Sequence, residues 1–180
     1  LRVHPQWMPG DDYYGLDSTL APRDVAAEGQ LWMEENALER AEAERPVSVI
    51  RASNVQGIPL SGPPGNGILH KWAAESQMGW INVPGDGSNV KDLVHVEDLV
   101  KVVGSILSNP PPTRESFAVG SGKGITMMEL GGIFNQKTGC DLELNQSDRG
   151  EVWGVTDAYF LEYRCGFRPS ISLDEMIDEA

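Results

Sequence analysis

The stretch Gly85-Asp-Gly-Ser-Asn-Val-Lys-Asp-Leu-Val-His-Val-Glu-Asp-Leu99 carries much of the information about the fold. Its glycines and first aspartate are typical of a turn, and residues 91–96 have the pattern of a strand or extended segment. Apolar residues then recur with a helical period, at Leu99, Val100, Val103, Ile106 and Leu107. We therefore expect a turn, a strand and a helix in succession, with the helix packed through Leu99, Val103 and Ile106.

Strand and helix patterns alternate on both sides of this stretch. Before it, we expect a helix over residues 24–45 that ends at Pro46, a strand over 46–51, a loop over 54–67, a helix over 68–77 and a strand over 81–83. After it, a strand over 116–119 precedes a capping box at Thr126 and Glu129, and an edge strand follows over 141–144. A second capping box, at Ser172 and Glu175, opens the last helix. This alternation predicts a mixed α/β fold with a mostly parallel sheet.

Composition excludes several classes of function. The 180 residues include 27 acidic and 14 basic side chains, for a net charge of −13, which argues against a basic nucleic-acid surface. No run of ~18 apolar residues is present, so we expect no membrane span. Cys140 and Cys165 have no CxxC spacing, and the three histidines are dispersed. We therefore expect no metal, no disulfide and a reducing, cytoplasmic compartment.

Two phosphate-binding motifs are absent or incomplete. Gly120-Ser-Gly-Lys-Gly124 ends in glycine where a Walker loop needs Ser or Thr, and Phe117 stands where its first glycine belongs. No GxGxxG turn follows a starting strand, so no helix N-terminus is prepared for a dinucleotide pyrophosphate. We expect residues 120–124 to form a strand-to-helix turn before the Thr126 cap.

Four segments, read together, resemble a known family. Arg51-Ala-Ser-Asn-Val-Gln-Gly57 resembles R-x-x-N-V-Y-G, and the stretch from Gly85 resembles GDG-x-x-x-RDFVHVDDL. Residues 157–175, with Cys165-Gly-Phe-Arg-Pro169, are similar to D-x(7)-LGW-x-P-x-x-SLEE, and Pro22 with Ala26-Ala-Glu28 resembles the end of P-x-x-x-Y-G-x-S-K-x-x-A-E. In this order and spacing, they resemble the extended short-chain dehydrogenases/reductases, the NAD(P)-dependent nucleotide-sugar epimerases and dehydratases, from about residue 21 onward.

The resemblance implies an α/β fold that is the C-terminal portion of a Rossmann-like NAD(P)-binding fold plus a small substrate-binding subdomain. Residues 1–57 would end the Rossmann-like domain. Residues 58–180 would be mainly substrate-binding, with a returning Rossmann strand and helix near 91–108. The family's first half, with its glycine-rich turn, has no counterpart here. We therefore expect a fragment, a chain that pairs with a missing N-terminal half, or a diverged protein. The implied cofactor is NAD or NADP.

The family's catalytic pair is replaced. The alignment places Leu20 at the catalytic Tyr and Asp24 at the Lys that lowers the phenol pKa. Leu20 cannot transfer a proton, and neither Tyr13 nor Tyr14 has a Lys four residues later. No catalytic residue is assigned. Two functions stay open: hydride transfer on a nucleotide sugar, as an oxidoreductase or isomerase, or a non-catalytic relative that binds a nucleotide ligand or a partner protein.

The resemblance also implies binding residues. Asn54 and Val55 would contact the cofactor, and Asn54, Lys91 and Arg149 would contact the substrate's phosphates. Lys91 keeps the positive charge of the family's Arg without its bidentate fork. Alternatively, Lys91 is a solvated strand-end charge and Arg149 a surface loop residue.

Three further features have structural readings. We expect His95 to hydrogen-bond within the fold and Asp98 to cap the following helix. The helix over 24–45 would form a homodimer bundle in the family, or pack as a solvated helix on one sheet face.

Overall fold

Strand β1 (Val47–Ala52) pairs in parallel with β5 (Arg114–Val119) at the base of the molecule. The computed structural model describes residues 25–58, 67–145 and 154–180. The register runs without a break from Val47 opposite Arg114 to Ala52 opposite Val119. Parallel strands need a long crossover connection, and within the described residues it contains three strands and two helices. This pair confirms the expected parallel α/β pattern.

A three-stranded sheet occupies the middle of the molecule. Strand β2 (Asn54–Gln56) lies parallel to β4 (Val90–His95), and β6 (Gly124–Thr126) runs antiparallel on its other side. Both β2 and β6 lie where the sequence predicted loops, and those two predictions were wrong. Both have three residues, too few to show a two-residue period.

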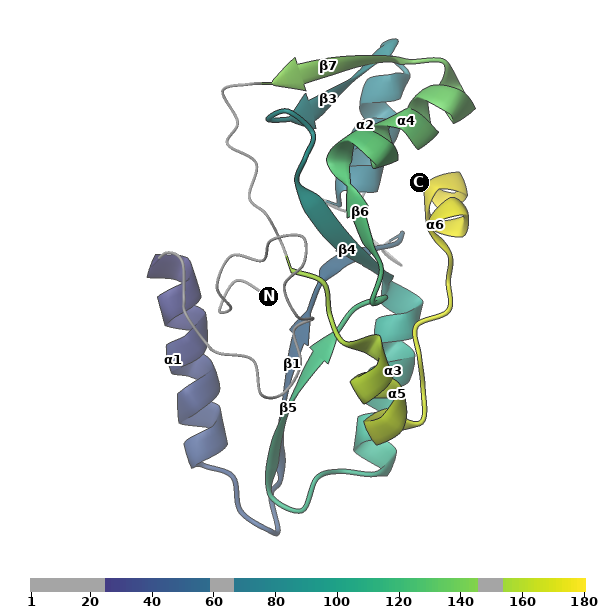
Figure 1. Ribbon diagram of the computed structural model, residues 1–180. Coiled ribbons are helices and arrows are strands. Elements are labelled where there is room, and N and C mark those ends of the chain that lie inside the picture. The colour runs from purple at the N-terminus through teal and green to yellow at the C-terminus, as the bar shows by residue number, and fades with distance from the viewer. Residues whose placement is uncertain (1–24, 59–66, 146–153) are drawn as a thin grey trace.

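A third layer lies above this sheet, where β3 (Trp80–Pro84) pairs in parallel with β7 (Asp141–Asn145) (Figure 1). Helices α2 (Ile68–Ser76) and α4 (Met127–Thr138) lie against this pair, and α6 (Leu173–Glu179) lies beside them. Together they enclose the larger core. Its fully buried members include Leu69, Trp72, Ile81, Val83, Met127, Leu130 and Phe134.

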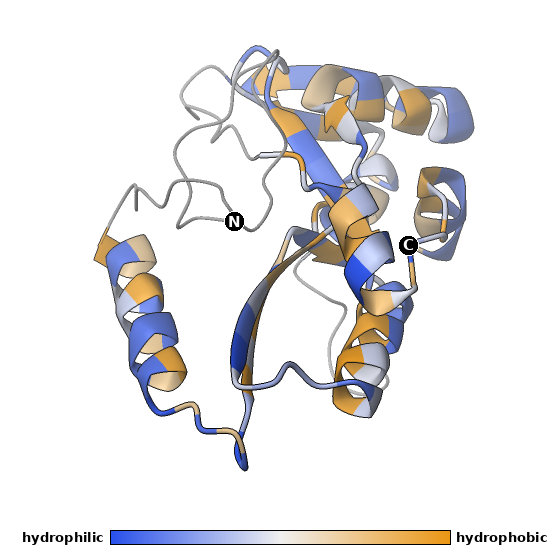
Figure 2. Ribbon diagram, turned by 60° about the horizontal axis from the view of Figure 1, so that its bottom comes forward, coloured by the Kyte–Doolittle hydropathy of each residue, from blue (hydrophilic) through white to orange (hydrophobic). Residues whose placement is uncertain are grey.

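A smaller core lies beneath. Helices α3 (Val96–Ser108) and α5 (Ala158–Cys165) cover one side of the β1–β5 pair, and α1 (Val25–Glu39) lies on the other side (Figure 1). The cluster under α3 and α5 contains Val102, Ile106, Phe117, Val119 and Leu161. By contrast, α1 mixes hydrophilic and hydrophobic residues along its whole surface (Figure 2). Its Trp32 side chain is 65% exposed.

The packed face of α3 differs from the predicted stripe. Ile106 is buried and Leu99 packs against the smaller core, as expected, and Val103 is half-buried. The centre of the face is Val102, which is fully buried, whereas Val100 and Leu107 are 63% and 75% exposed. Several apolar side chains lie around this helix, so contact with β5 and α5 selects the buried face. The predicted roles of Val100 and Leu107 were therefore wrong.

Helix ends follow local signals. Both predicted capping boxes are confirmed: the hydroxyls of Thr126 and Ser172 accept from the amides of Glu129 and Glu175, whose carboxylates accept in return. Helix α1 stops at Glu39, six residues before its predicted end at residue 45. The residues after it form turns and a bridge between Glu42 and Arg45.

Within the described ranges, the longest helices are too short or too polar to cross a lipid bilayer.

Candidate functional site

Asn54 and Lys91 lie on the neighbouring strands β2 and β4. Asn54 stands opposite Leu93, two positions after Lys91, and its Nδ2 donates to the Asp92 carbonyl oxygen at 3.4 Å. Lys91 is half-buried and stands opposite Ile125 of β6. Val55 follows Asn54 in β2 and is exposed. The structure therefore brings the predicted substrate contacts Asn54 and Lys91 into one short stretch of sheet.

The other predicted positions fall in segments outside the described residues. Arg149 lies in the range 146–153, and Leu20, Asp24, Tyr13 and Tyr14 lie in the range 1–24. The Arg149 contact and the replaced catalytic pair stay predictions.

Beside Lys91, the carboxylate of Asp92 is completely buried and accepts five hydrogen bonds. Its Oδ1 accepts from the amide and hydroxyl of Ser121 at 2.8 and 2.7 Å. Its Oδ2 accepts from the amide and hydroxyl of Thr156 at 3.0 and 2.7 Å, and from the Gly122 amide at 3.3 Å. A buried charge is tolerated when it is satisfied in this way. Asp92 thus holds two separate segments, residues 121–122 and Thr156, against the strand that carries Lys91.

Gly120 lies at the centre of this junction. A Cβ at this position would lie 2.4 Å from Asp92 Oδ2, 2.6 Å from Thr156 Oγ1 and 2.8 Å from Ser53 Oγ. Glycine is therefore required by close packing. The Ser53 hydroxyl is buried here and makes no hydrogen bond with the described residues.

The glycine-rich loop that follows Gly120 donates hydrogen bonds from its backbone to the Asp92 carboxylate. The predicted strand-to-helix turn is present, but Gly124 already belongs to β6. The amides of Ser121 and Gly122, which could face a phosphate in such a loop, donate to Asp92 instead. This use of the loop was not foreseen, because one aspartate in a strand gives no motif. A charged residue inside an apolar strand, as in Asp92-Leu-Val94, was the available signal.

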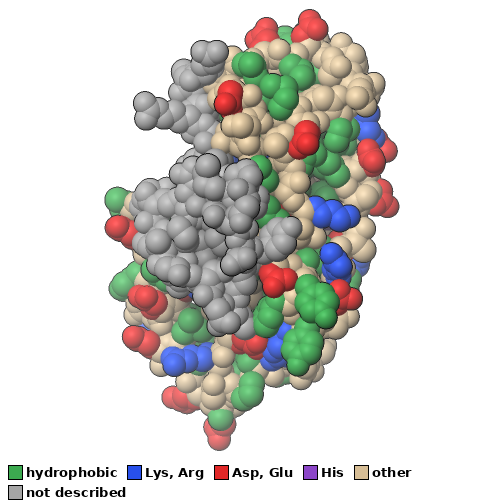
Figure 3. Space-filling model, in the orientation of Figure 1, with side chains coloured by type: hydrophobic (Ala, Val, Ile, Leu, Met, Phe, Trp, Pro, Cys, Tyr) green, Lys and Arg blue, Asp and Glu red, His purple; other side chains and the backbone are tan. Residues whose placement is uncertain are grey.

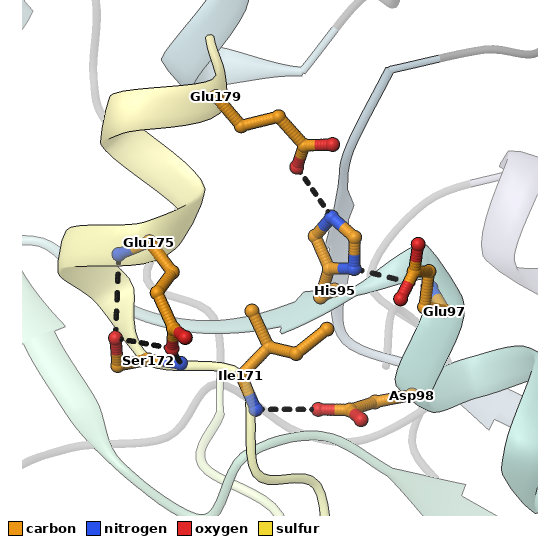
Figure 4. Close-up of polar contacts among 7 residues, drawn as sticks. All are labelled: His95, Glu97, Asp98, Ile171, Ser172, Glu175 and Glu179. Carbon is orange, nitrogen blue, oxygen red and sulfur yellow. Dashed lines mark hydrogen bonds and ion pairs between the residues drawn. The ribbon is translucent and has the colours of Figure 1, made fainter.

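His95 and Asp98 attach the C-terminal segment (Figure 4). His95 Nδ1 accepts from the Glu97 amide at 3.2 Å, so His95 caps α3, and its Nε2 lies 2.6 Å from Glu179 Oε2. Because Nδ1 accepts, the proton of the neutral ring lies on Nε2 and is donated to Glu179. The expected hydrogen bonding of His95 is confirmed.

Asp98 does not cap α3, and that prediction was wrong. Its Oδ2 accepts from the amides of Ser170 and Ile171 at 2.7 and 2.8 Å, and its Oδ1 lies 3.1 Å from Lys101 Nζ. Burial raises the pKa of Asp98, but the two amides and Lys101 together outweigh it, so the pKa falls below its ordinary value. Asp98 therefore stays ionised and fixes the chain just before α6.

A cavity of about 950 Å³ opens between α4, β6 and this fixed segment. Neither Asn54 nor Lys91 lines it, although Leu93 does. Its lining includes Lys123 and Arg168 among hydroxyl and apolar side chains. This cavity was not predicted from the sequence, because its lining comes from segments far apart in the chain.

No family model and no curated protein matches the sequence. Solved structures do match the fold. A dTDP-glucose 4,6-dehydratase from Bacillus anthracis, solved with NAD, shares 18% identity at a TM-score of 0.81, over 97% of this chain and 56% of that chain. MoeE5, solved with UDP-glucuronic acid and NAD, shares 20% identity at 0.83, over 99% and 60%. A UDP-glucuronic acid 4-epimerase from Bacillus cereus shares 13% identity at 0.83, over 99% and 57%.

The chain thus spans somewhat more than half the length of these solved structures. At this level of identity the likeness shows the fold. It confirms the predicted class, an α/β chain that matches the C-terminal part of a Rossmann-like dehydratase or epimerase fold.

Proposed function

We propose that the chain binds a nucleotide sugar, as the substrate-side portion of an NAD(P)-dependent epimerase or dehydratase. The observation that carries this proposal is the placement of Asn54 and Lys91 on adjacent strands, within a fold otherwise seen in such enzymes. MoeE5 and the Bacillus cereus epimerase were solved with UDP-glucuronic acid and NAD, which gives the class of ligand to test.

The ammonium of Lys91 would neutralise part of a diphosphate, and the Asn54 amide would donate a hydrogen bond to it. In a chain with net charge −13, a diphosphate is repelled unless cations converge on it. Arg149 is the second cation that the sequence offers for this site. Asp92 supports the arrangement because its five hydrogen bonds fix the strand that carries Lys91.

The described residues do not fit the phosphates of the cofactor. The glycine-rich loop over 120–124 gives its amides to Asp92, so it cannot cradle a pyrophosphate. We therefore place the NAD(P) phosphates on a partner half of the fold, with Asn54 and Val55 facing the cofactor.

The proposed division into residues 1–57 and 58–180 agrees with this arrangement. The exposed Trp32 and Met33 on α1 support pairing through that helix, with a second copy or with a further part of such a fold. Two free thiols favour the reducing cytoplasm. On the face of the molecule shown in Figure 3, acidic side chains lie among the basic ones.

A second candidate is a non-catalytic relative that binds a nucleotide or a protein partner. Leu20 and Asp24, at the positions of the Tyr and Lys, favour it. Leu20 supplies no proton, and Asp24 would raise the pKa of a neighbouring phenol. Ligand binding without turnover would support this candidate.

The test is calorimetry of the wild type, Lys91→Ala and Arg149→Ala with UDP-glucose, UDP-glucuronic acid and dTDP-glucose. We expect one ligand to bind, and each variant to weaken it about tenfold, since ~1.4 kcal/mol is one decade. Added salt should reproduce part of this loss. Arg114→Ala, which removes an exposed cation from the far end of β5, should bind like the wild type. Equal binding by all variants would place the site elsewhere, and no binding by the wild type would contradict the proposal.

A further inference from the structure

The cavity between α4 and the segment before α6 has a preformed wall. The amides of Ser170 and Ile171, which line it, are fixed by Asp98 at 2.7 and 2.8 Å. The next residue, Ser172, lies in the capping box that starts α6. The charge-assisted hydrogen bonds to Asp98 and the capping box involve three consecutive residues, so the backbone of this wall has little conformational freedom. The cavity, about 950 Å³, lies near the upper end of the range of ligand pockets, roughly 300–1,000 Å³.

Apolar side chains form one part of the cavity lining, beside polar ones. Leu93 and Met176 belong to the larger core, and Ile125, Ile133, Ile171 and Leu173 pack against it. These side chains can bury the apolar body of a ligand, and they offer it no charge. The lining therefore favours an occupant with a sizeable hydrophobic part.

The charges at the cavity differ in sign from those of the chain as a whole. Two cations, Lys123 and Arg168, line it against one carboxylate, Glu129. The Glu129 carboxylate already takes part in the capping box of α4, because its Oε2 accepts hydrogen bonds from the amide and hydroxyl of Thr126 at 2.9 and 2.7 Å. Lys123 forms no ion pair within the described residues. Arg168 meets Glu162 only at 3.8 Å, with both side chains about half exposed, which is a weak contact.

We propose that this cavity is a second ligand site, and that it binds a small amphipathic anion. The apolar body would lie on Leu93, Ile133 and Met176, and its carboxylate, sulfonate or phosphate would face Lys123 and Arg168. The inference does not rest on the proposed nucleotide site, because neither Asn54 nor Lys91 lines the cavity.

The probe is anilinonaphthalene sulfonate, a fluorescent amphipathic anion, titrated into the full 180-residue chain. We expect saturable binding with one site per chain, displaced by octanoate and not by octanol. Lys123→Gln and Arg168→Gln should each raise the dissociation constant about fivefold, which corresponds to ~1 kcal/mol. Arg114→Gln removes the same charge from an exposed position outside the cavity and should leave the affinity unchanged.

A steric pair of variants tests the location. Gly132 lines the cavity from α4, and a Cβ there would meet nothing within 4 Å. Gly132→Ala should therefore fold and bind the probe, whereas Gly132→Leu should fill the cavity and lower the affinity at least tenfold. Thermal melting followed by circular dichroism is the control that checks whether both variants are folded.

Three results would overturn the inference. The first is equal displacement by octanol, which removes the role of the charge. The second is probe binding unchanged by Gly132→Leu or by both charge variants. The third is competitive displacement by UDP-glucose, which would make the cavity part of the nucleotide site. Lys91→Ala should leave the probe's affinity unchanged, so failure here and failure of the nucleotide proposal are told apart.

Discussion

Asp92 in β4 and Thr156, 64 positions later in the chain, are joined by two hydrogen bonds to one carboxylate oxygen. The donors are the Thr156 amide at 3.0 Å and its hydroxyl at 2.7 Å. The same carboxylate binds the loop after β5 through Ser121 and Gly122. One side chain therefore connects the sheet that carries Lys91 to two segments that cover it.

Asp92→Asn should destabilise the chain strongly. The amide group keeps one acceptor oxygen and turns an NH₂ toward donors, so several buried groups lose their partner. We expect a loss of about 3 kcal/mol or more in the free energy of unfolding, measured by urea denaturation. Asp141→Asn, at an exposed position in β7, is the control and should change it by less than ~0.5 kcal/mol. Similar stability of the two variants would contradict the role of Asp92.

Gly120→Ala tests the packing around the same carboxylate. The new Cβ would lie 2.4 Å from Asp92 Oδ2 and would displace atoms that hold a buried network. We expect a loss of about 2 kcal/mol or more in a thermal or urea denaturation. Gly104→Ala is the matched control, since Gly104 lies in α3 with nothing within 4 Å of its Cβ position. This control should gain up to ~1 kcal/mol from helix propensity; a gain by Gly120→Ala as well would show that the site has room.

Asp98→Asn should show a pH-dependent loss of stability. The pKa of Asp98 is lowered from 3.8, so its ionised form stabilises the folded state. This contribution is fully present above the unfolded pKa and is lost as the pH falls through the lower folded pKa. At pH ~7 we expect the variant to be about 2 kcal/mol less stable, because the bonds from the two amides lose the charge of their shared acceptor Oδ2 and the new NH₂ group faces Lys101 in place of Oδ1. Urea denaturation from pH ~7 down to pH ~3 should show this difference shrinking below pH ~4; a difference that grows in acid would contradict the assignment.

The isolated chain should not turn over nucleotide sugars. Leu20 and Asp24 stand at the positions of the proton-transferring pair, and the chain has no GxGxxG turn. Nicotinamide absorbance, followed with NAD and each of the three nucleotide sugars used for calorimetry, should stay flat. A competent epimerase or dehydratase in the same buffer is the positive control. Stoichiometric reduction of the nicotinamide by this chain would refute the prediction.

Local signals in the sequence predicted the starts of α4 and α6 correctly, whereas they placed the end of α1 six residues too late. Thr126 with Glu129 and Ser172 with Glu175 form capping boxes as expected, because each box needs only residues three apart. The longer strands β1, β4 and β5 were predicted to within a few residues. The strands β2 and β6 were not, because three residues show no period.

Roles that depend on distant residues could not be predicted. Asp98 stands where a capping residue is expected, but its partners Ser170 and Ile171 lie more than 70 positions away. Asn54 and Lys91 were predicted as binding residues through a resemblance. Asp92 was visible in the sequence only as a charge inside an apolar strand, and its partners Ser121 and Thr156 lie far along the chain. The cavity at Lys123 and Arg168 was missed for the same reason.

Helix α6 is the last described element in the chain, and its Met176 and Ile177 nevertheless belong to the larger core with Leu69 and Trp72. During synthesis, the strands and helices that surround this core leave the ribosome with one side of it still uncovered. Burial of this core is completed only when α6 packs. Asp98 then binds the chain just before the helix, and His95 binds Glu179 at its last residue. Until α6 packs, the apolar side chains that it covers stay exposed, and surface of this kind makes a partly folded chain prone to aggregation.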